Sequence, residues 1–409
     1  MELQGISKLD LKRRNRMQIL KVIKECGPIS RVDIASSMKI TRAAVTIITN
    51  EMIEEGILYE VGEAPVSLEN LQKGRRKILI DINENYKFAL GASVSDEYIS
   101  VGLANLNGKT MDKTYTNLTP DMTDEDILKY IEESCQNLMQ NSCLDTSKIL
   151  GLGVAIQSDM CSKMKIYHKD GKLDYSGVER NLSDMLGVEV ICSNLTSALA
   201  LANQEENVEE RTGNYVFLKL GKHVNLAILL ENEVMHENVD YTNHVEKIIV
   251  NPGGRKHEGF PDGSVKAELT QDTIIAKYKE VFSQADTPYL WEATNGDADA
   301  INYKTMWAAF SKGDTKAVEV LDGVLKTLTV LVNNLSIAFF AKSVVLHGFR
   351  MNDWTYDRFK KCATEMCGEE LAKKIQLSRT EGNLEFKGGI CTVILENFYN
   401  KGGIDLENY

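Results

Sequence analysis

The sequence has no uninterrupted apolar run of membrane length, and its first ten residues lack the apolar stretch that secretion requires. We therefore expect no membrane-spanning helix and no export, which indicates a cytoplasmic protein. The eight cysteines are scattered, and no two of them have the CxxC spacing that zinc sites favour. In a reducing compartment they are expected to be buried apolar side chains without disulfides.

An excess of basic residues is confined to the front of the chain. Residues 1–80 hold 14 Lys and Arg against 10 Asp and Glu, a net charge of +4, so the remainder carries −16 of the total of −12. A chain of 409 residues with 43% apolar residues predicts two or three globular domains. The acidic body suppresses non-specific contact with DNA, so a polyanion would be bound at the front end.

The stretch 28–56 predicts two short helices that meet at a tight turn. Ser30 and Thr41 are suited to cap the first and the second helix. Apolar residues recur at helical spacing in the second helix and are expected to face inward, namely Val45, Ile48 and Met52. The pattern is that of a helix-turn-helix.

The outward face of the second predicted helix is short and uncharged, with no acidic residue between Thr41 and Asn50. Asn pairs bidentately with adenine, Thr and Ile contact the thymine methyl, and an Arg at the helix start suits a phosphate. An ordinary surface helix is the alternative interpretation. The predicted DNA-contacting residues here are Thr41, Arg42, Ala43, Thr46, Ile47 and Asn50.

Basic residues flank this motif on both sides. Residues 9–26 predict a helix whose basic cluster is either a solvated face or a set of phosphate contacts. Two predicted strands, 57–61 and 78–81, enclose a loop with a basic tip, as in a winged helix. The predicted DNA-contacting residues of this wing are Lys73, Arg75 and Arg76, with a bare basic turn as the alternative. Residues 1–82 are therefore predicted to form a winged helix-turn-helix DNA-binding domain.

From residue 86 the pattern changes to alternating strands and helices, which predicts an α/β body with mixed sheets. The expected strands are 87–94, 98–105, 149–156, 188–192, 215–220, 225–230 and 342–346. The expected helices are 123–139, 196–205 and 315–340.

The winged helix, the GRRK entry at residues 74–77 and the order of strands together resemble the ROK (repressor, open reading frame, kinase) family. The resemblance covers nearly the whole chain and implies a winged helix joined to a two-lobed actin-like and hexokinase-like body. It places residues 86–192 and 385–409 in lobe one, and residues 193–384 in lobe two with the dimerisation surface and an effector cleft. Repressor members of the family sense sugars, whereas kinase members phosphorylate them.

Four kinase features of the family are altered in this chain. Ser93 stands at the aspartate of the first phosphate turn, and Leu195 stands at the aspartate that acts as general base. The second phosphate loop reads GKHVN at residues 221–225, and the nucleotide-binding triple glycine reads HGF at 347–349. Side chains therefore occupy the backbone cradle for ATP, and we expect neither a cofactor nor enzyme activity.

The sugar and zinc motifs of the family are altered too. At its ExGH motif the chain reads HVEK, so that His244 replaces the glutamate and Lys247 the histidine, while Asn194 remains from the sugar motif. These groups favour an acidic or phosphorylated sugar as effector, with internal pairing of Lys247 to Glu246 as the equal alternative. The zinc-binding run should fall at residues 257–264, which contain no cysteine, so no metal is expected.

The leading hypothesis is a transcriptional repressor of carbohydrate-related genes that binds double-stranded operator DNA as a homodimer or a dimer of dimers. A possible sugar or acidic sugar effector would act through the inactive body. A sugar kinase with an accessory DNA-binding domain and a ligand-independent DNA-bound scaffold are the alternatives. The target genes and the sign of the ligand's effect on DNA binding remain open at this point.

Overall fold

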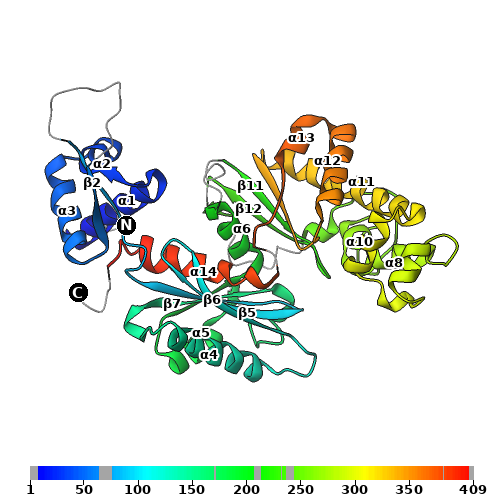
Figure 1. Cartoon of the computed structure of the whole chain (residues 1–409), viewed down its shortest axis with the longest axis horizontal. Helices are drawn as coiled ribbons and strands as arrows, with labels where there is room; N and C mark the ends of the chain where they lie inside the picture. The colour runs from blue at the N-terminus through cyan, green and yellow to red at the C-terminus, as the bar shows by residue number, and fades with distance from the viewer. Residues whose placement is uncertain are drawn as a thin grey trace.

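The structure, a computed structural model, describes residues 8–63, 76–169, 172–206, 213–231, 233–235, 244–380 and 382–404. It has three parts (Figure 1). The N-terminal winged-helix domain, up to residue 82, is built around a small three-stranded sheet and is called the reader below. The other two parts are lobes, each built around a five-stranded sheet. The mixed α/β fold with an N-terminal winged helix confirms the predicted fold class.

The reader forms as predicted from its capping residues. The Ser30 hydroxyl accepts a hydrogen bond from the Asp33 amide, and the Thr41 hydroxyl accepts one from the Ala44 amide. Lys39 ends the first of these helices in a left-handed conformation, with a φ of 56°. The elements are α1 Lys8–Cys26, β1 Ile29–Ser30, α2 Arg31–Met38, α3 Arg42–Glu54, β2 Leu58–Glu63 and β3 Ile78–Ile82, with the strands in the order β1-β3-β2.

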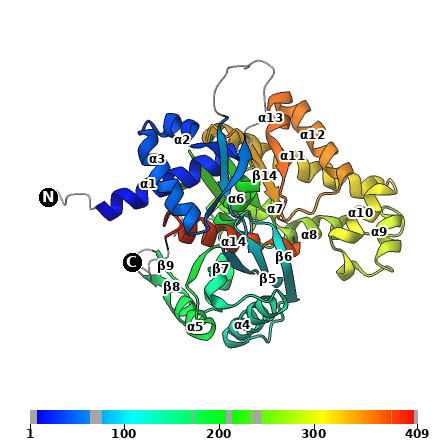
Figure 2. The same ribbon diagram turned by 60° about the vertical axis from the view of Figure 1, so that its left-hand side comes forward.

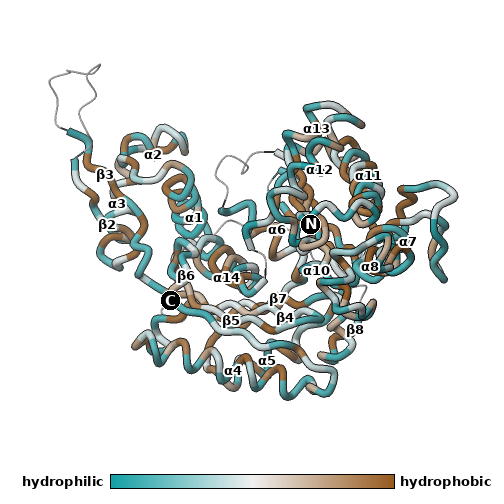
Figure 3. The backbone as a smooth tube through the Cα atoms, turned by 45° about the vertical axis from the view of Figure 1, so that its right-hand side comes forward, coloured by the Kyte–Doolittle hydropathy of each residue, from teal (hydrophilic) through white to brown (hydrophobic). Residues whose placement is uncertain are grey.

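Lobe one contains a sheet in the order β10-β7-β4-β5-β6. Its strands are β4 Phe88–Val94, β5 Tyr98–Asn105, β6 Thr110–Asn117, β7 Ile149–Ile156 and β10 Val190–Asn194. Helices α4 Asp124–Asn141 and α5 Ser176–Leu186 cover one face, and Figure 3 shows hydrophilic and hydrophobic residues alternating along them. A small hairpin of β8 Tyr167–Lys169 and β9 Lys172–Asp174 precedes α5.

The opposite face of this sheet is covered by the end of the chain, helix α14 Lys387–Val393 (Figures 1 and 2). The approach is close because both surfaces carry glycine. A Cβ atom added at Gly153 of β7 would lie 2.0 Å from the carbonyl oxygen of Gly389. Helix α6 Leu195–Glu206, which follows β10, also packs against α14.

Lobe two contains a sheet in the order β13-β12-β11-β14-β15. Its strands are β11 Tyr215–Lys219, β12 Asn225–Leu230, β13 Glu233–Val234, β14 Ser343–His347 and β15 Ile375–Leu377. Its helices are α7 Val265–Leu269, α8 Gln271–Val281, α9 Pro288–Ala293, α10 Tyr303–Ser311, α11 Thr315–Ala338, α12 Asp353–Cys367 and α13 Glu369–Lys374. Short 3-10 helices at Thr146–Lys148, Ser158–Met160, His244–Lys247, Ala298–Ala300 and Gly382–Leu384 complete the described elements.

Of the described helices, α11 is long and apolar enough to cross a membrane by length and composition. Half of its most apolar window is nevertheless buried inside the protein. Leu321, Leu325, Leu328 and Leu335 of this helix belong to the buried core of lobe two. We therefore interpret α11 as a core helix.

The reader is anchored on lobe one by the last part of the chain. After α14 the backbone continues as a π-helical turn, Ile394–Tyr399. Phe398 and Tyr399 of this turn share one buried apolar cluster with Ile19, Leu20 and Ile23 of α1. Residues from opposite ends of the sequence therefore form the core between reader and body.

Candidate nucleic-acid interface and interlobe cleft

Helix α3 turns its predicted reading face to solvent. Val45, Ile48 and Met52 are buried against the rest of the reader, as predicted from their spacing. Ile47, by contrast, is 62% exposed although it is a large apolar side chain. The predicted contact residues of α3 and its cap are all exposed, namely Thr41, Arg42, Ala43, Thr46, Ile47 and Asn50. This surface has the shape and chemistry that a recognition helix needs.

Arg31 at the start of α2 orients Asn50, a contact that the sequence does not reveal. Its guanidinium donates to the Asn50 Oδ1 at 3.0 Å and to the Thr49 hydroxyl at 3.0 Å. It also forms an ion pair with Glu60 of β2 at 3.0 Å. Because the amide oxygen accepts from Arg31, the Asn50 Nδ2 is directed away as a donor. Arg31 lies 19 residues from Asn50, so only the tertiary fold brings the two together.

The base of the wing carries paired charges. Arg76 forms an exposed ion pair with Glu63 at 2.9 Å, and Lys77 forms one with Asp33 at 2.7 Å. Hydrogen bonds from Lys77 and then from Ser30 lower the pKa of Asp33. The predicted contacts Lys73 and Arg75 lie outside the described residues.

Three residues of the basic cluster of α1 have partners within the protein. Arg16 is fully buried, where it donates to Glu55 at 2.8 Å and to the Gly402 carbonyl at 2.9 Å. Arg13 donates to the Asn400 carbonyl at 3.0 Å, and Lys12 forms an ion pair with Glu51 at 2.8 Å. These contacts tie α1 to α3 and to the residues near 400, and of the three side chains Arg16 is buried while Arg13 is exposed.

The positions that carry catalysis in kinase members of the family are closed by packing. The Ser93 hydroxyl is buried and lies 2.7 Å from the Ser100 hydroxyl. Leu195 is fully buried. Asn194 is 4% exposed; its Oδ1 accepts from the Thr196 amide at 2.9 Å, and its Nδ2 donates to the Ser158 hydroxyl at 2.9 Å. The predicted effector contact Asn194 therefore acts in this structure as the cap of α6.

Between the lobes, buried side chains form a polar network. Lys219 of β11 donates to the Gln157 Oε1 at 2.8 Å, and Gln157 in turn donates to Asp96 at 3.1 Å. His347 of β14 lies 2.8 Å from Glu385, and both side chains are at most 3% exposed. The cavity that remains here measures about 40 Å³. Lys219, His347 and Glu385 line this pocket, which is smaller than a typical small-molecule site.

Electrostatics favours the charged form of Glu385. Burial alone would raise its pKa, yet the Lys219 ammonium and the His347 imidazole together hold the pKa of Glu385 below its usual value. Burial also raises the pKa of Tyr98, whose hydroxyl hydrogen-bonds to Glu385. The network therefore holds a buried carboxylate between groups from both lobes.

In the second part of the predicted effector site, the buried charged residue is Glu246 and not His244 or Lys247. His244 and Lys247 are exposed, whereas Glu246 between them is 2% exposed. Glu246 accepts from the Val224 amide at 3.0 Å and from Lys266 at 3.2 Å, and His223 lies 3.4 Å away. Although burial opposes it, these partners, with His223 first, lower the pKa of Glu246. The acid anticipated as an internal partner of Lys247 is instead paired with Lys266 and His223.

The expected zinc region forms a turn that leads into α7. The Ser264 hydroxyl caps this helix by accepting from the Ala267 amide. In the part of the chain that the structure describes, no group of three or more His, Cys, Asp or Glu side chains could hold a metal ion.

Fold and site together define a class: a winged-helix reader joined to a two-lobed, kinase-like body whose phosphate region is filled by side chains. Residues 90–383 match the ROK family, and residues 12–59 match a winged helix-turn-helix DNA-binding family. The first match covers more than half of the chain. The chain therefore belongs to the ROK family.

Two curated relatives are regulators. The xylose repressor of Caldicellulosiruptor bescii is 21% identical over 243 residues, which are 59% of this chain and 60% of that repressor. The chain thus spans less than two thirds of that protein. The DNA-binding transcriptional dual regulator NagC of Escherichia coli is 21% identical over 338 residues, which are 80% of each chain.

A solved structure extends the similarity to the complete fold. The crystal structure of a ROK family transcriptional regulator, a homologue of the E. coli MLC protein, matches with a TM-score of 0.71 and 17% identity. The match covers 96% of this chain and 97% of that one. At this identity the comparison supports the shared fold.

Proposed function

We propose that this protein is a DNA-binding, sugar-responsive transcriptional repressor of carbohydrate-related genes. The observation that carries the proposal is the exposed outer face of α3, which is capped by Thr41, contains no acidic residue between Thr41 and Asn50, and lies beside strands β2 and β3. Relatives named as a xylose repressor and as NagC support it. The proposed contacts are the α3 residues 41–43, 46, 47 and 50, together with Lys73, Arg75 and Arg76 of the wing.

The body is proposed to be a sensor without catalytic activity. Leu195 has no group that can accept a proton, and it is fully buried. Lys219 and His347 project into the space between the lobes, where the phosphates of ATP would have to enter. We therefore expect no phosphorylation of sugars by ATP, in contrast to a sugar kinase with an accessory DNA-binding domain.

The repressor is proposed to act in the cytoplasm as a homodimer on a pseudo-palindromic operator, or as a dimer of dimers. Two readers related by a two-fold axis reach half-sites on one face of the duplex. Exposed apolar side chains near the end of α11 support self-association, since Ile337 is 65% and Phe340 is 85% exposed. The predicted division of the chain after residues 82 and 192 remains part of this proposal.

The effector is proposed to bind between the lobes, near Asn194, His244 and Lys247. We infer this class of ligand from the exposed His244 and Lys247, whose N–H groups can donate to the oxygen atoms of an acidic or phosphorylated sugar. Lobe movement on binding would be transmitted to the reader through α6 and α14. A scaffold that binds DNA and senses nothing is the competing function.

Fluorescence anisotropy with purified protein and its native operator tests the DNA-binding function. Asn50→Ala should weaken binding to the operator by roughly 1–3 kcal/mol and relax preference at one base pair, while non-specific binding is retained. Asn141→Ala, an exposed substitution at the end of α4, is the matched control. Equal operator affinity and equal base preference for both variants would rule out the proposed reading face.

A further inference from the structure

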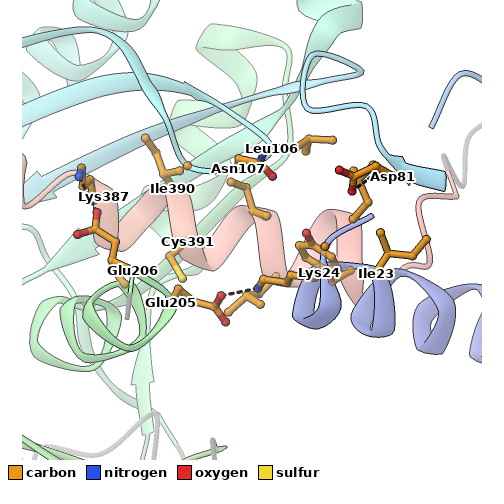
Figure 4. A pocket seen from close by; sticks show the side chains of 17 residues that line it. Ile23, Lys24, Asp81, Leu106, Asn107, Glu205, Glu206, Lys387, Ile390 and Cys391 are labelled. Carbon is orange, nitrogen blue, oxygen red and sulfur yellow. Dashed lines mark hydrogen bonds and ion pairs between the residues drawn. The ribbon is translucent and has the colours of Figure 1, made fainter. Parts of the chain in front are cut away.

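A cavity of about 350 Å³ lies where the reader meets the body (Figure 4). Its walls come from α1 and β3 of the reader and from the β5–β6 turn, α6 and α14 of the body. Small-molecule sites typically measure about 300–1,000 Å³, and they occur preferentially at domain interfaces. Both the size and the place of this cavity therefore suit a small ligand.

Most of the lining is apolar and belongs to both parts of the protein. Ile23 and Ile82 come from the reader, whereas Leu106, Ile390 and Ile394 come from the body. Most small-molecule sites combine such an apolar lining with a few polar groups that orient the ligand.

Four of the charged groups in the cavity wall neutralise one another. Lys24 forms an ion pair with Glu205 at 2.6 Å, and Lys387 forms one with Glu206 at 2.5 Å, as the dashed lines in Figure 4 show. Lys24 also lies 4.4 Å from the centre of the Tyr399 ring. These two lysines are held by protein groups and leave little positive charge for an anionic ligand.

Asp81 at the end of β3 is the remaining charged group of this wall. Its Oδ1 accepts from the Ile82 amide at 2.8 Å. Among the described residues, no Lys, Arg or His forms an ion pair with this carboxylate, and its charged neighbour is Glu84, another acid. The side chain is half-buried, and burial raises the pKa of Asp81. The cavity thus offers one uncompensated carboxylate beside an apolar surface.

We propose that this cavity binds a small amphiphilic amine, whose ammonium pairs with Asp81 and whose apolar part lies against Ile23, Leu106 and Ile390. The cation supplies the charge that the wall lacks, in a partly desolvated place where an ion-paired hydrogen bond is strong. The site is separate from the interlobe cleft. Because reader and body both contribute walls, a bound amine contacts both and fixes the position of the reader on lobe one.

Calorimetry on the full chain at neutral pH tests the charge requirement with three probes of equal length: n-pentylamine, pentan-1-ol and pentanoate. The amine should bind saturably, and more tightly than the alcohol and the carboxylate. Asp81→Asn should weaken amine binding by about tenfold or more, since it removes a charge-assisted hydrogen bond. Asp357→Asn, an exposed substitution on α12, should leave it unchanged.

A second variant tests the location without touching a charge. Ala202 of α6 is 3% exposed and lines the cavity, so Ala202→Leu should fill part of it and reduce amine binding severalfold while Asp81 is intact. This variant decides the question if Asp81→Asn does not fold. Equal binding of amine and alcohol, absence of saturable amine binding, or full amine affinity in Ala202→Leu would each overturn the proposal.

Discussion

At the scale of single residues, the side chain of Asn50 on the proposed reading face is oriented by hydrogen bonding to a neighbouring side chain. Asn50 is fixed by Arg31, and Arg31 is itself fixed by Glu60. An Asn held by one rotamer-limiting partner loses less conformational entropy when it pairs with a base. Arg31 is therefore a positioning residue for Asn50.

Replacing Arg31 tests this role. Arg31→Met should weaken operator binding by about 1 kcal/mol and reduce discrimination at the base pair that Asn50 reads, because Asn50 loses its partner. Combining Arg31→Met with Asn50→Ala should cost little more than Asn50→Ala alone, as measured by anisotropy in a double-mutant cycle. Arg180→Met, exposed on α5, is the control. Additive losses in the cycle would mean that Arg31 acts independently, for example on a phosphate.

At the scale of elements, α1 and α6 join parts of the protein that are far apart in sequence. Helix α1 holds the end of the chain through Arg13 and Arg16. Helix α6 begins at the Asn194 cap beside the interlobe cleft, and Glu205 at its other end pairs with Lys24 of α1. Helix α6 therefore connects the region of Asn194 to α1 of the reader.

The stability of the α1 anchor rests on a buried guanidinium. Arg16→Met should lower the free energy of unfolding by about 2–4 kcal/mol, because Glu55 and the Gly402 carbonyl lose their shared donor. Chemical denaturation followed by circular dichroism measures the loss. Arg14→Met, at an exposed neighbouring position, should change stability by less than about 0.5 kcal/mol. Similar losses in both variants would show that Arg16 contributes no more than a surface charge.

At the scale of the whole molecule, the two lobes are linked by a buried polar network. Gln157 and Asp96 belong to lobe one, whereas Lys219 and His347 belong to lobe two. Hydrogen bonds of this network therefore join the two lobes.

The pH dependence of stability follows from Glu385. Its folded pKa lies below the ordinary value of 4.5, so its stabilising effect is complete above that pH and is lost as pH falls through the folded pKa. Glu385→Gln should therefore destabilise the protein by roughly 2 kcal/mol at pH 7 and by much less in acid. Chemical denaturation at pH 7 and at a pH below the folded pKa of Glu385 measures the two free energies of unfolding. The exposed substitution Glu258→Gln is the control. A cost for Glu385→Gln that does not change with pH would contradict a charged role for Glu385.

The winged-helix domain and the class of fold could be predicted from local patterns in the sequence. Local signals specify these features: the hydroxyls of Ser30 and Thr41 cap the next helix, and Val45, Ile48 and Met52 follow the period of a helix. Capping and periodicity act within a few residues, so they can be read without knowledge of the fold. The similarity to the family could be predicted from the sequence as well, because short motifs also lie within a few residues.

The partners of the charged and polar side chains, by contrast, depend on how distant segments pack together. The four basic residues within positions 12–16 of α1 have the same local pattern whether they face DNA, solvent or protein, yet Arg16 is buried against Gly402, 386 residues away. Asn194 and Lys247 stand at motif positions of the family, whereas Glu246, Lys266 and His223 meet only because separate segments of lobe two fold together. Long-range pairing depends on the complete packing of the chain, and the spacing of residues in the sequence contains no record of it.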